Sequence, residues 1–143
     1  MFIPYINLSD EKFWRKRKLV FTFSKADSFK ATSFSLNRIS EKSSKDKWEK
    51  WSKSKDVNLV VTLDSKKDRI IIYSEILQLF EIIEYIDEVI TPTDKTVSFI
   101  CKNNDGENCT LSIITRINQF NRMQLYVNYE DRILNYNIEN LKE

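Results

Sequence analysis

The fold is decided by residues 97–113, which read Val97-Ser98-Phe99-Ile100-Cys101-Lys102-Asn103-Asn104-Asp105-Gly106-Glu107-Asn108-Cys109-Thr110-Leu111-Ser112-Ile113. Apolar and polar residues alternate on both sides of the Asp105-Gly106 pair. Alternation with a period of two is typical of a strand with one buried face. Glycine also supplies the positive φ that a tight turn needs. The stretch therefore predicts an antiparallel hairpin.

The length of the hairpin loop decides how its two cysteines face each other. A two-residue loop places Cys101 and Cys109 diagonally, whereas a three-residue loop with a glycine bulge places them directly opposite. We expect both thiols to be reduced and partly buried, as is usual inside cells. Two thiols without a histidine make a poor zinc site, because structural zinc usually takes four ligands. No metal is expected.

The same alternation recurs on both sides of this hairpin, over residues 57–63, 123–129 and 134–138. After a turn at 64–68, the apolar run 69–73 returns as a further strand. So many period-two segments in series predict an antiparallel meander with one buried face. The expected fold is mainly β, a single domain of six to eight strands that is barrel-like or a sandwich, with one or two short helices. The strand count is similar to that of a lipocalin-type barrel, but the Gly-x-Trp signature of that family is absent.

The segment from Glu75 to Ile90 fits two secondary structures. Its polar residues recur about every third position, but on a helical wheel they spread around the cylinder and leave no apolar stripe. Its many β-branched residues favour a long strand, and helix is the alternative. The segment also holds the only acidic cluster able to do acid–base work, but such a cluster is more typical of a charged strand edge. The cluster consists of Glu81, Glu84, Asp87 and Glu88.

The first third of the chain is basic. Residues 1–56 carry 14 Lys/Arg against 7 Asp/Glu and residues 57–143 carry 9 against 14, so charges of +7 and −5 sum to the net +2. We therefore divide the single domain 1–143 into a basic N-terminal part, 1–56, and a β meander, 57–143. In the basic part, residues 25–28 are predicted to form a turn and 29–36 a weaker strand.

Aromatic and basic residues of this N-terminal part form the candidate site. A short helix is expected to start at Ser9, and the cations that follow Trp14 either close that helix or form an anion-binding patch. Two tryptophans three residues apart suggest a second helix, which either covers the sheet or offers exposed rings for stacking. The candidate partner-binding residues are Trp14, Arg15, Lys16, Arg17, Lys18, Trp48 and Trp51.

Composition excludes several kinds of chemistry. The chain has one glycine, Gly106, and no histidine. A phosphate-binding loop needs several glycines, and the Ser-His-Asp and Cys-His arrangements need a histidine. No apolar run approaches the length of a membrane helix, and residues 1–6 lack the basic start of a signal peptide. We expect a cytoplasmic protein that is not an enzyme and uses no cofactor.

Several short motifs between residues 48 and 138 follow an order that resembles a group of small uncharacterised bacterial proteins. The matching pieces are Trp48-Glu49-Lys50-Trp51, Asp68-Arg69-Ile70-Ile71-Ile72-Tyr73-Ser74, Cys101…Asp105-Gly106-Glu107-Asn108-Cys109, Gln124-Leu125-Tyr126-Val127 and Tyr136-Asn137-Ile138. The resemblance implies the meander and no particular activity. The many Lys, Asn and Ile residues, which AT-rich codons encode, point to a bacterial or phage origin.

The features together favour a non-enzymatic protein-interaction or inhibitor-type binding module, whose expected partner is another protein. Exposed Trp, Tyr and Arg would carry such binding, since these residues dominate interface hot spots. One alternative is a nucleic-acid-binding module that uses the basic N-terminal part for phosphate contacts and stacking. The other is a barrel with an apolar cavity for a small ligand. The sequence leaves the partner and the oligomeric state open.

Overall fold

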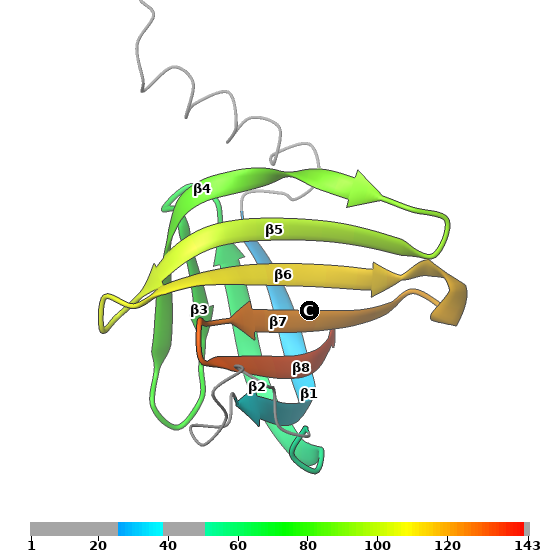
Figure 1. Cartoon of the computed structure of the whole chain (residues 1–143), viewed down its shortest axis with the longest axis horizontal. Helices are drawn as coiled ribbons and strands as arrows, with labels where there is room; N and C mark the ends of the chain where they lie inside the picture. The colour runs from blue at the N-terminus through cyan, green and yellow to red at the C-terminus, as the bar shows by residue number, and fades with distance from the viewer. Residues whose placement is uncertain (1–25, 39–50, 142–143) are drawn as a thin grey trace, which may run out of the picture.

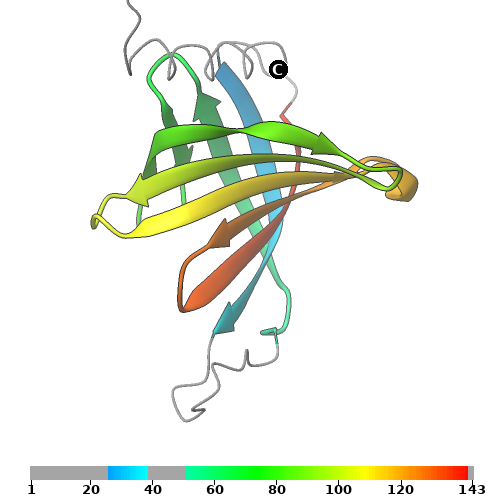
Figure 2. The ribbon, with the colours of Figure 1, turned by 45° about the horizontal axis from the view of Figure 1, so that its top comes forward.

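The computed structural model describes residues 26–38 and 51–141. These residues form a closed barrel of eight strands, in which every strand pairs antiparallel with its neighbour and the last pairs with the first (Figure 1). The strands are β1 (Ala26–Arg38), β2 (Lys55–Asp64), β3 (Arg69–Ile72), β4 (Gln78–Ile90), β5 (Asp94–Asn103), β6 (Asn108–Arg116), β7 (Arg122–Asn128) and β8 (Arg132–Asn140). Strands β5 and β6 cross β1 and β2 at a steep angle (Figure 2).

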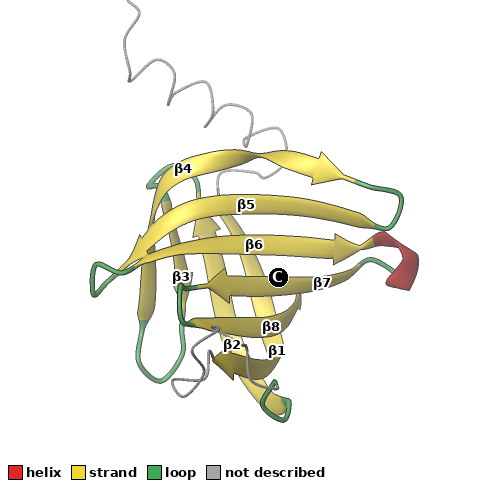
Figure 3. Cartoon of the chain, viewed as in Figure 1, coloured by secondary structure: helices red, strands yellow, loops and turns green. Residues whose placement is uncertain are grey.

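The mainly β antiparallel meander is confirmed, and the structure decides for a barrel over a sandwich. The segment 75–90 contains the predicted strand, β4. The expectation of one or two short helices is not met in the described part of the chain, where the only helical element is a single 3-10 turn, η1 (Ile117–Gln119; Figure 3). The helix expected from Ser9 and residue Trp48 of the second expected helix lie outside that part.

The turn predicted over residues 25–28 is wrong where the structure describes it. Asp27 and Ser28 are residue types that favour turns, yet they pair with Leu63 and Thr62 of β2 in a regular ladder. Pairing with β2 outweighs the local turn preference here, and from Phe29 onward β1 also pairs with β8 and so closes the barrel. The weaker strand expected over 29–36 is therefore part of a longer one.

Apolar side chains from all eight strands fill the interior of the barrel. Phe29, Phe80 and Phe99 lie on three different strands, and each has at most 2% of its surface exposed. An eight-stranded barrel is just wide enough inside for side chains to fill it. Burial of these rings, at about 25 cal/mol per Å² of apolar surface, is therefore a large part of the stabilisation.

Two buried tyrosines carry their hydroxyl groups to polar partners near opposite ends of β3. Tyr85 donates a hydrogen bond of 2.7 Å to a carboxylate oxygen of Asp68 in the β2–β3 turn. The Gln78 amide of β4 donates 3.1 Å to the hydroxyl of Tyr136 on β8, a strand that is not its neighbour in the sheet. Burial raises the pKa of both phenols, so they stay neutral. These bonds satisfy polar atoms that the core would otherwise leave unpaired.

The β5–β6 hairpin has the longer of the two predicted loops. Asn103 and Glu107 close it through a backbone hydrogen bond of 2.9 Å, and Gly106 adopts a φ of 84°. Cys101 and Cys109 consequently lie directly opposite each other on neighbouring strands. Both thiols are free and buried.

Alkaline pH is expected to destabilise the protein through these thiols. Burial raises the pKa of Cys109 to about 11 and that of Cys101 further. In the unfolded chain a thiol ionises near pH 8.5, so the stabilisation is complete below that pH and is lost as pH rises through about 11. Urea unfolding between pH 8 and 11 measures the loss. It should be smaller in a Cys101→Val/Cys109→Ala variant, and an equal loss in both proteins would contradict the assignment.

Candidate protein-binding surface

Of the predicted site residues, only Trp51 lies in the described part of the chain. Trp14, Arg15, Lys16, Arg17, Lys18 and Trp48 lie outside it. The side chain of Trp51 is 44% exposed. Its ring stands edge-on to that of Tyr126 on β7, with 6.4 Å between the ring centroids. Trp51 thus lies against the outer surface of the barrel, where a partner can reach it.

Two hydrogen bonds hold the chain beside Trp51 in place. The backbone N–H of Ser52 donates 2.7 Å to the carbonyl of Leu36 in β1. The Leu36 N–H in turn donates 2.8 Å to the hydroxyl of Ser52. This reciprocal pair fixes the start of the segment that leads into β2, so Trp51 is carried on an ordered backbone.

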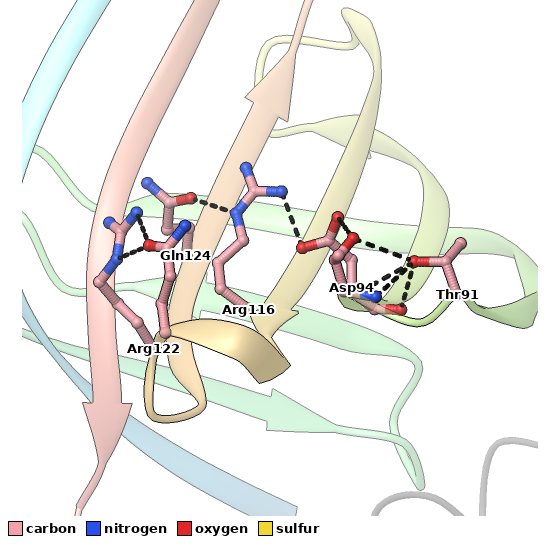
Figure 4. A network of polar contacts seen from close by, with 7 residues as sticks. Thr91, Asp94, Arg116, Arg122 and Gln124 are labelled. Carbon is pink, nitrogen blue, oxygen red and sulfur yellow. Dashed lines mark hydrogen bonds and ion pairs between the residues drawn. The ribbon is translucent and has the colours of Figure 1, made fainter.

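Tyr126 connects Trp51 to a polar network on the outer face of β6 and β7. The network is centred on Arg116, whose Nη1 lies 3.1 Å from an Asp94 carboxylate oxygen and whose Nε donates 3.0 Å to Gln124 (Figure 4). The Asp94 carboxylate, and a further hydrogen bond to Tyr126, raise the pKa of Arg116. Gln124 is only 6% exposed although it faces outward. The network therefore holds the guanidinium in one position.

This network also ties two loops together at the end of the barrel where β4 ends and β7 begins (Figure 1). In the β4–β5 turn, Asp94 donates its N–H to the Thr91 hydroxyl at 2.9 Å. Ile117 of the β6–β7 loop donates its N–H to the Thr93 carbonyl at 2.8 Å. Arg122 donates from two nitrogens to Gln119 within the same loop (Figure 4). The β6–β7 loop, residues 117–121, is thus braced from both sides; we call it the β6–β7 tip.

The β6–β7 tip presents Phe120 fully to solvent. The exposure of this side chain is 102%, and its backbone has a φ of 57°. A left-handed conformation is a genuine outlier for a bulky residue and costs about 1–2 kcal/mol. Ile117 beside it is 42% exposed. The strained backbone at Phe120 therefore lowers stability, and the exposed ring makes no packing contact that offsets this cost.

The opposite end of the barrel satisfies its own polar groups. Arg132 bonds Glu107 at 3.0 Å and Asp131 at 2.8 Å, and its guanidinium lies 3.8 Å from the centroid of the Tyr129 ring. Hydrogen bonds from Arg132 and Asn103 lower the pKa of Glu107. These contacts pair the charged and aromatic groups of the β5–β6 and β7–β8 hairpins with one another.

Two members of the acidic cluster suggested by the sequence lie beside basic residues in the described part of the chain. Glu81 stands between Arg69 and Lys102 in the strand register, and Glu88 lies 3.4 Å from Lys95. Among the described residues, no group of three or more His, Cys, Asp or Glu side chains is gathered to hold a metal ion. Nor does any helix among them have the length and apolarity to cross a lipid bilayer.

Sequence analysis pointed to Trp51 but missed Phe120 and Arg116. One signal was available for Phe120: period-two alternation stops after Ile113 and resumes at Met123, which predicts a loop containing an aromatic residue between them. In the structure that loop is shorter, because β6 continues to Arg116 and β7 begins at Arg122. Arg116 gave no signal, because its partners become neighbours only through strand pairing.

Comparison of the chain with protein-family models, curated proteins and solved structures found no match. The function is therefore argued from the site itself.

Proposed function

We propose that this protein is a non-enzymatic binding module that docks on another protein through the surface formed by the β6–β7 tip and the neighbouring Arg116, Tyr126 and Trp51. The observation that carries the proposal is the fully exposed Phe120 in a left-handed backbone conformation. Strain of this kind persists where the surrounding structure enforces it, and it concentrates at ligand clamps and functional sites.

The chemistry of the surface supports a protein partner. Trp, Tyr and Arg are the residue types enriched in interface hot spots, and here one of each is joined by contacts on the outer face. Ordered side chains lose little entropy on binding, so a braced guanidinium and a fixed aromatic pair favour affinity. The apolar tip would enter a pocket on the partner, and the polar network would form the rim around it.

The packing of the interior supports this choice over a small-ligand barrel. The inward-facing phenylalanines belong to one buried cluster, and a hydrogen bond joins β4 to β8 across the interior. A ligand would have to displace these large side chains. For the nucleic-acid alternative, the basic residues on which it depends lie outside the described part of the chain, apart from a few scattered lysines.

Replacing Phe120 by Asp is expected to weaken binding about tenfold or more, because a charge cannot enter an apolar pocket. The partner is first captured by cross-linking from the source organism and identified, and its affinity for purified wild type and variant is then measured by titration calorimetry. The matched control is Ile76→Asp, which changes a side chain that is 81% exposed on the β3–β4 loop. Equal affinities for wild type and Phe120→Asp would overturn the proposal.

The variant Phe120→Asn is expected to bind poorly and yet unfold at higher denaturant concentration. Asparagine tolerates the left-handed conformation, so the variant should gain up to about 1 kcal/mol of stability. The lost ring costs nothing in packing, because it is fully exposed. Equilibrium urea unfolding measures the gain. A loss of more than about 1 kcal/mol would mean that Phe120 supports the fold, contrary to the strain argument.

A further inference from the structure

One edge of β4 is left without a strand partner among the described residues. On this side β4 pairs with the short strand β3 over Gln78–Glu81, and a backbone hydrogen bond of 2.8 Å runs from the Ile82 N–H to the Asp68 carbonyl. From there to Ile90, the described strands pair with β4 only on its β5 side (Figure 1). Proteins usually cover or blunt such an edge.

This edge combines exposed apolar side chains with negative charge. The exposed apolar residues of the β4 edge are Ile83 at 42%, Ile86 at 36%, Val89 at 56% and Ile90 at 65%. Over residues 81–90 the chain has four acidic residues and no basic one, a charge of −4. Four large aliphatic side chains exposed on one short segment mark a site that another part of a protein covers.

Two register shifts in β4 make this edge unsuitable for pairing with a regular additional strand. The pairing of β4 with β5 shifts register between Ile82 and Glu84 and again between Ile86 and Val89. Bulges of this kind bend the strand and break the even spacing of its N–H and C=O groups. An amphipathic segment that packs side chain against side chain suits the edge better than strand addition.

We propose that the first 25 residues of this same chain dock on the β4 edge. They contain six Lys/Arg and two Asp/Glu, a charge of +4 against the −4 of residues 81–90. Next to the run Arg15-Lys16-Arg17-Lys18 stand Phe13 and Trp14, which provide an apolar surface beside the cations. The segment thus has the positive charge and the apolar side chains that complement the β4 edge.

Strand pairing places the start of the described chain close to this edge. Ala26 pairs with Asp64, Asp64 with Arg69 and Arg69 with Glu81, so Ala26 lies in the same cross-strand row as the start of the edge. Three strand spacings amount to about 14 Å, and the middle of the edge is about 17 Å further along β4. The twelve residue-to-residue steps from Trp14 to Ala26 span about 18 Å as a helix and about 40 Å when extended. The segment can therefore reach the edge within one chain.

The proposal assigns a third role to the basic run, besides closing a helix or binding an external anion. Pairing in cis puts the cations near the carboxylates at a high effective concentration, so weak individual contacts suffice. Since exposed ion pairs are screened by salt, the apolar contacts hold the segment at physiological ionic strength.

Hydrogen exchange of the full-length chain tests the proposal. In a Lys16→Glu/Lys18→Glu variant, the amides of residues 84–90 are expected to exchange about tenfold faster than in wild type, because loss of the cover exposes them. The matched control is Lys53→Glu/Lys55→Glu, which makes the same charge change at two exposed lysines at the start of β2. It should leave exchange at 84–90 unchanged. Unchanged exchange in the first variant would overturn the proposal.

A charge-reversal variant tests whether the N-terminal cations pair directly with the carboxylates of the β4 edge. Adding Glu84→Lys and Asp87→Lys to the Lys16→Glu/Lys18→Glu variant should restore slow exchange at 84–90. If the amides of residues 84–90 in the fourfold variant still exchange faster than in wild type, direct pairing of these charges is contradicted.

Cross-linking tests whether the two segments lie together within one chain. In a Trp14→Cys/Ile86→Cys variant, a short bismaleimide should link the two new thiols within one chain, whereas wild type, with its buried cysteines, should not react. Linked dimers would show that the N-terminal segment of a second copy covers the β4 edge. The absence of any cross-linked product would show that the segment covers it neither within the chain nor between chains. Either outcome would overturn the proposal.

Discussion

Phe99→Ala is expected to lower the free energy of unfolding by about 3–5 kcal/mol. Phe99 lies on β5 with 0% of its surface exposed, and its ring stands edge-on to that of Tyr85, with 5.8 Å between the centroids. Truncation removes this aromatic pair and leaves a cavity that the surrounding β ladder cannot collapse to fill. No other kind of single change discussed for this protein should cost as much.

Equilibrium urea unfolding followed by circular dichroism measures this loss. The matched control is Ile76→Ala, at a position that is 81% exposed, and it should change stability by less than about 0.5 kcal/mol. If Phe99→Ala does not fold, Phe99→Leu provides the second measurement, with an expected loss of about 1 kcal/mol. A loss below about 1 kcal/mol for Phe99→Ala would contradict a close-packed interior.

Arg116→Leu is expected to cost about 2 kcal/mol and to loosen the β6–β7 tip. The substitution removes the donor to Gln124, whose side chain is 6% exposed, and the cation that pairs with Asp94. A buried acceptor left without a donor is more costly than the net value of the bond suggests. The loop 117–121 should then exchange its amide hydrogens faster, and affinity for the protein partner should fall as the display of Phe120 becomes less ordered.

Arg122→Leu is the matched control for this prediction. Arg122 is exposed and bonds Gln119 and Asn137, which are not buried, so its loss should cost less than about 1 kcal/mol. Urea unfolding separates the two variants. Equal losses would show that the network around Arg116 contributes no more than an ordinary surface contact.

Most of the strands could be predicted from the sequence because their signal is local. Alternation marked the strands on either side of Gly106, and the β-branched residues of 75–90 favoured the long strand that is β4. The single glycine located a hairpin turn that needs positive φ, and its loop length then fixed Cys101 opposite Cys109. The candidate site was predicted only in part, since Trp51 is the one named residue that lies in the described chain.

The sequence by itself determined the β class, the meander and, in the segments with a period of two, which side chains face the core, because alternation is a local signal. Closure was decided only by the tertiary structure, because Ala31 of β1 pairs with Ile138 of β8 across a circuit of six intervening strands. At the start of β1, pairing with β2 overrode the turn preference of Asp27 and Ser28. The same holds for the proposed binding surface. Asp94 and Gln124 meet Arg116 across neighbouring strands, and the conformation of Phe120 is imposed by the loop they brace. Local sequence patterns carry no information about such contacts, because the contacts depend on the register and curvature of all the strands of the barrel.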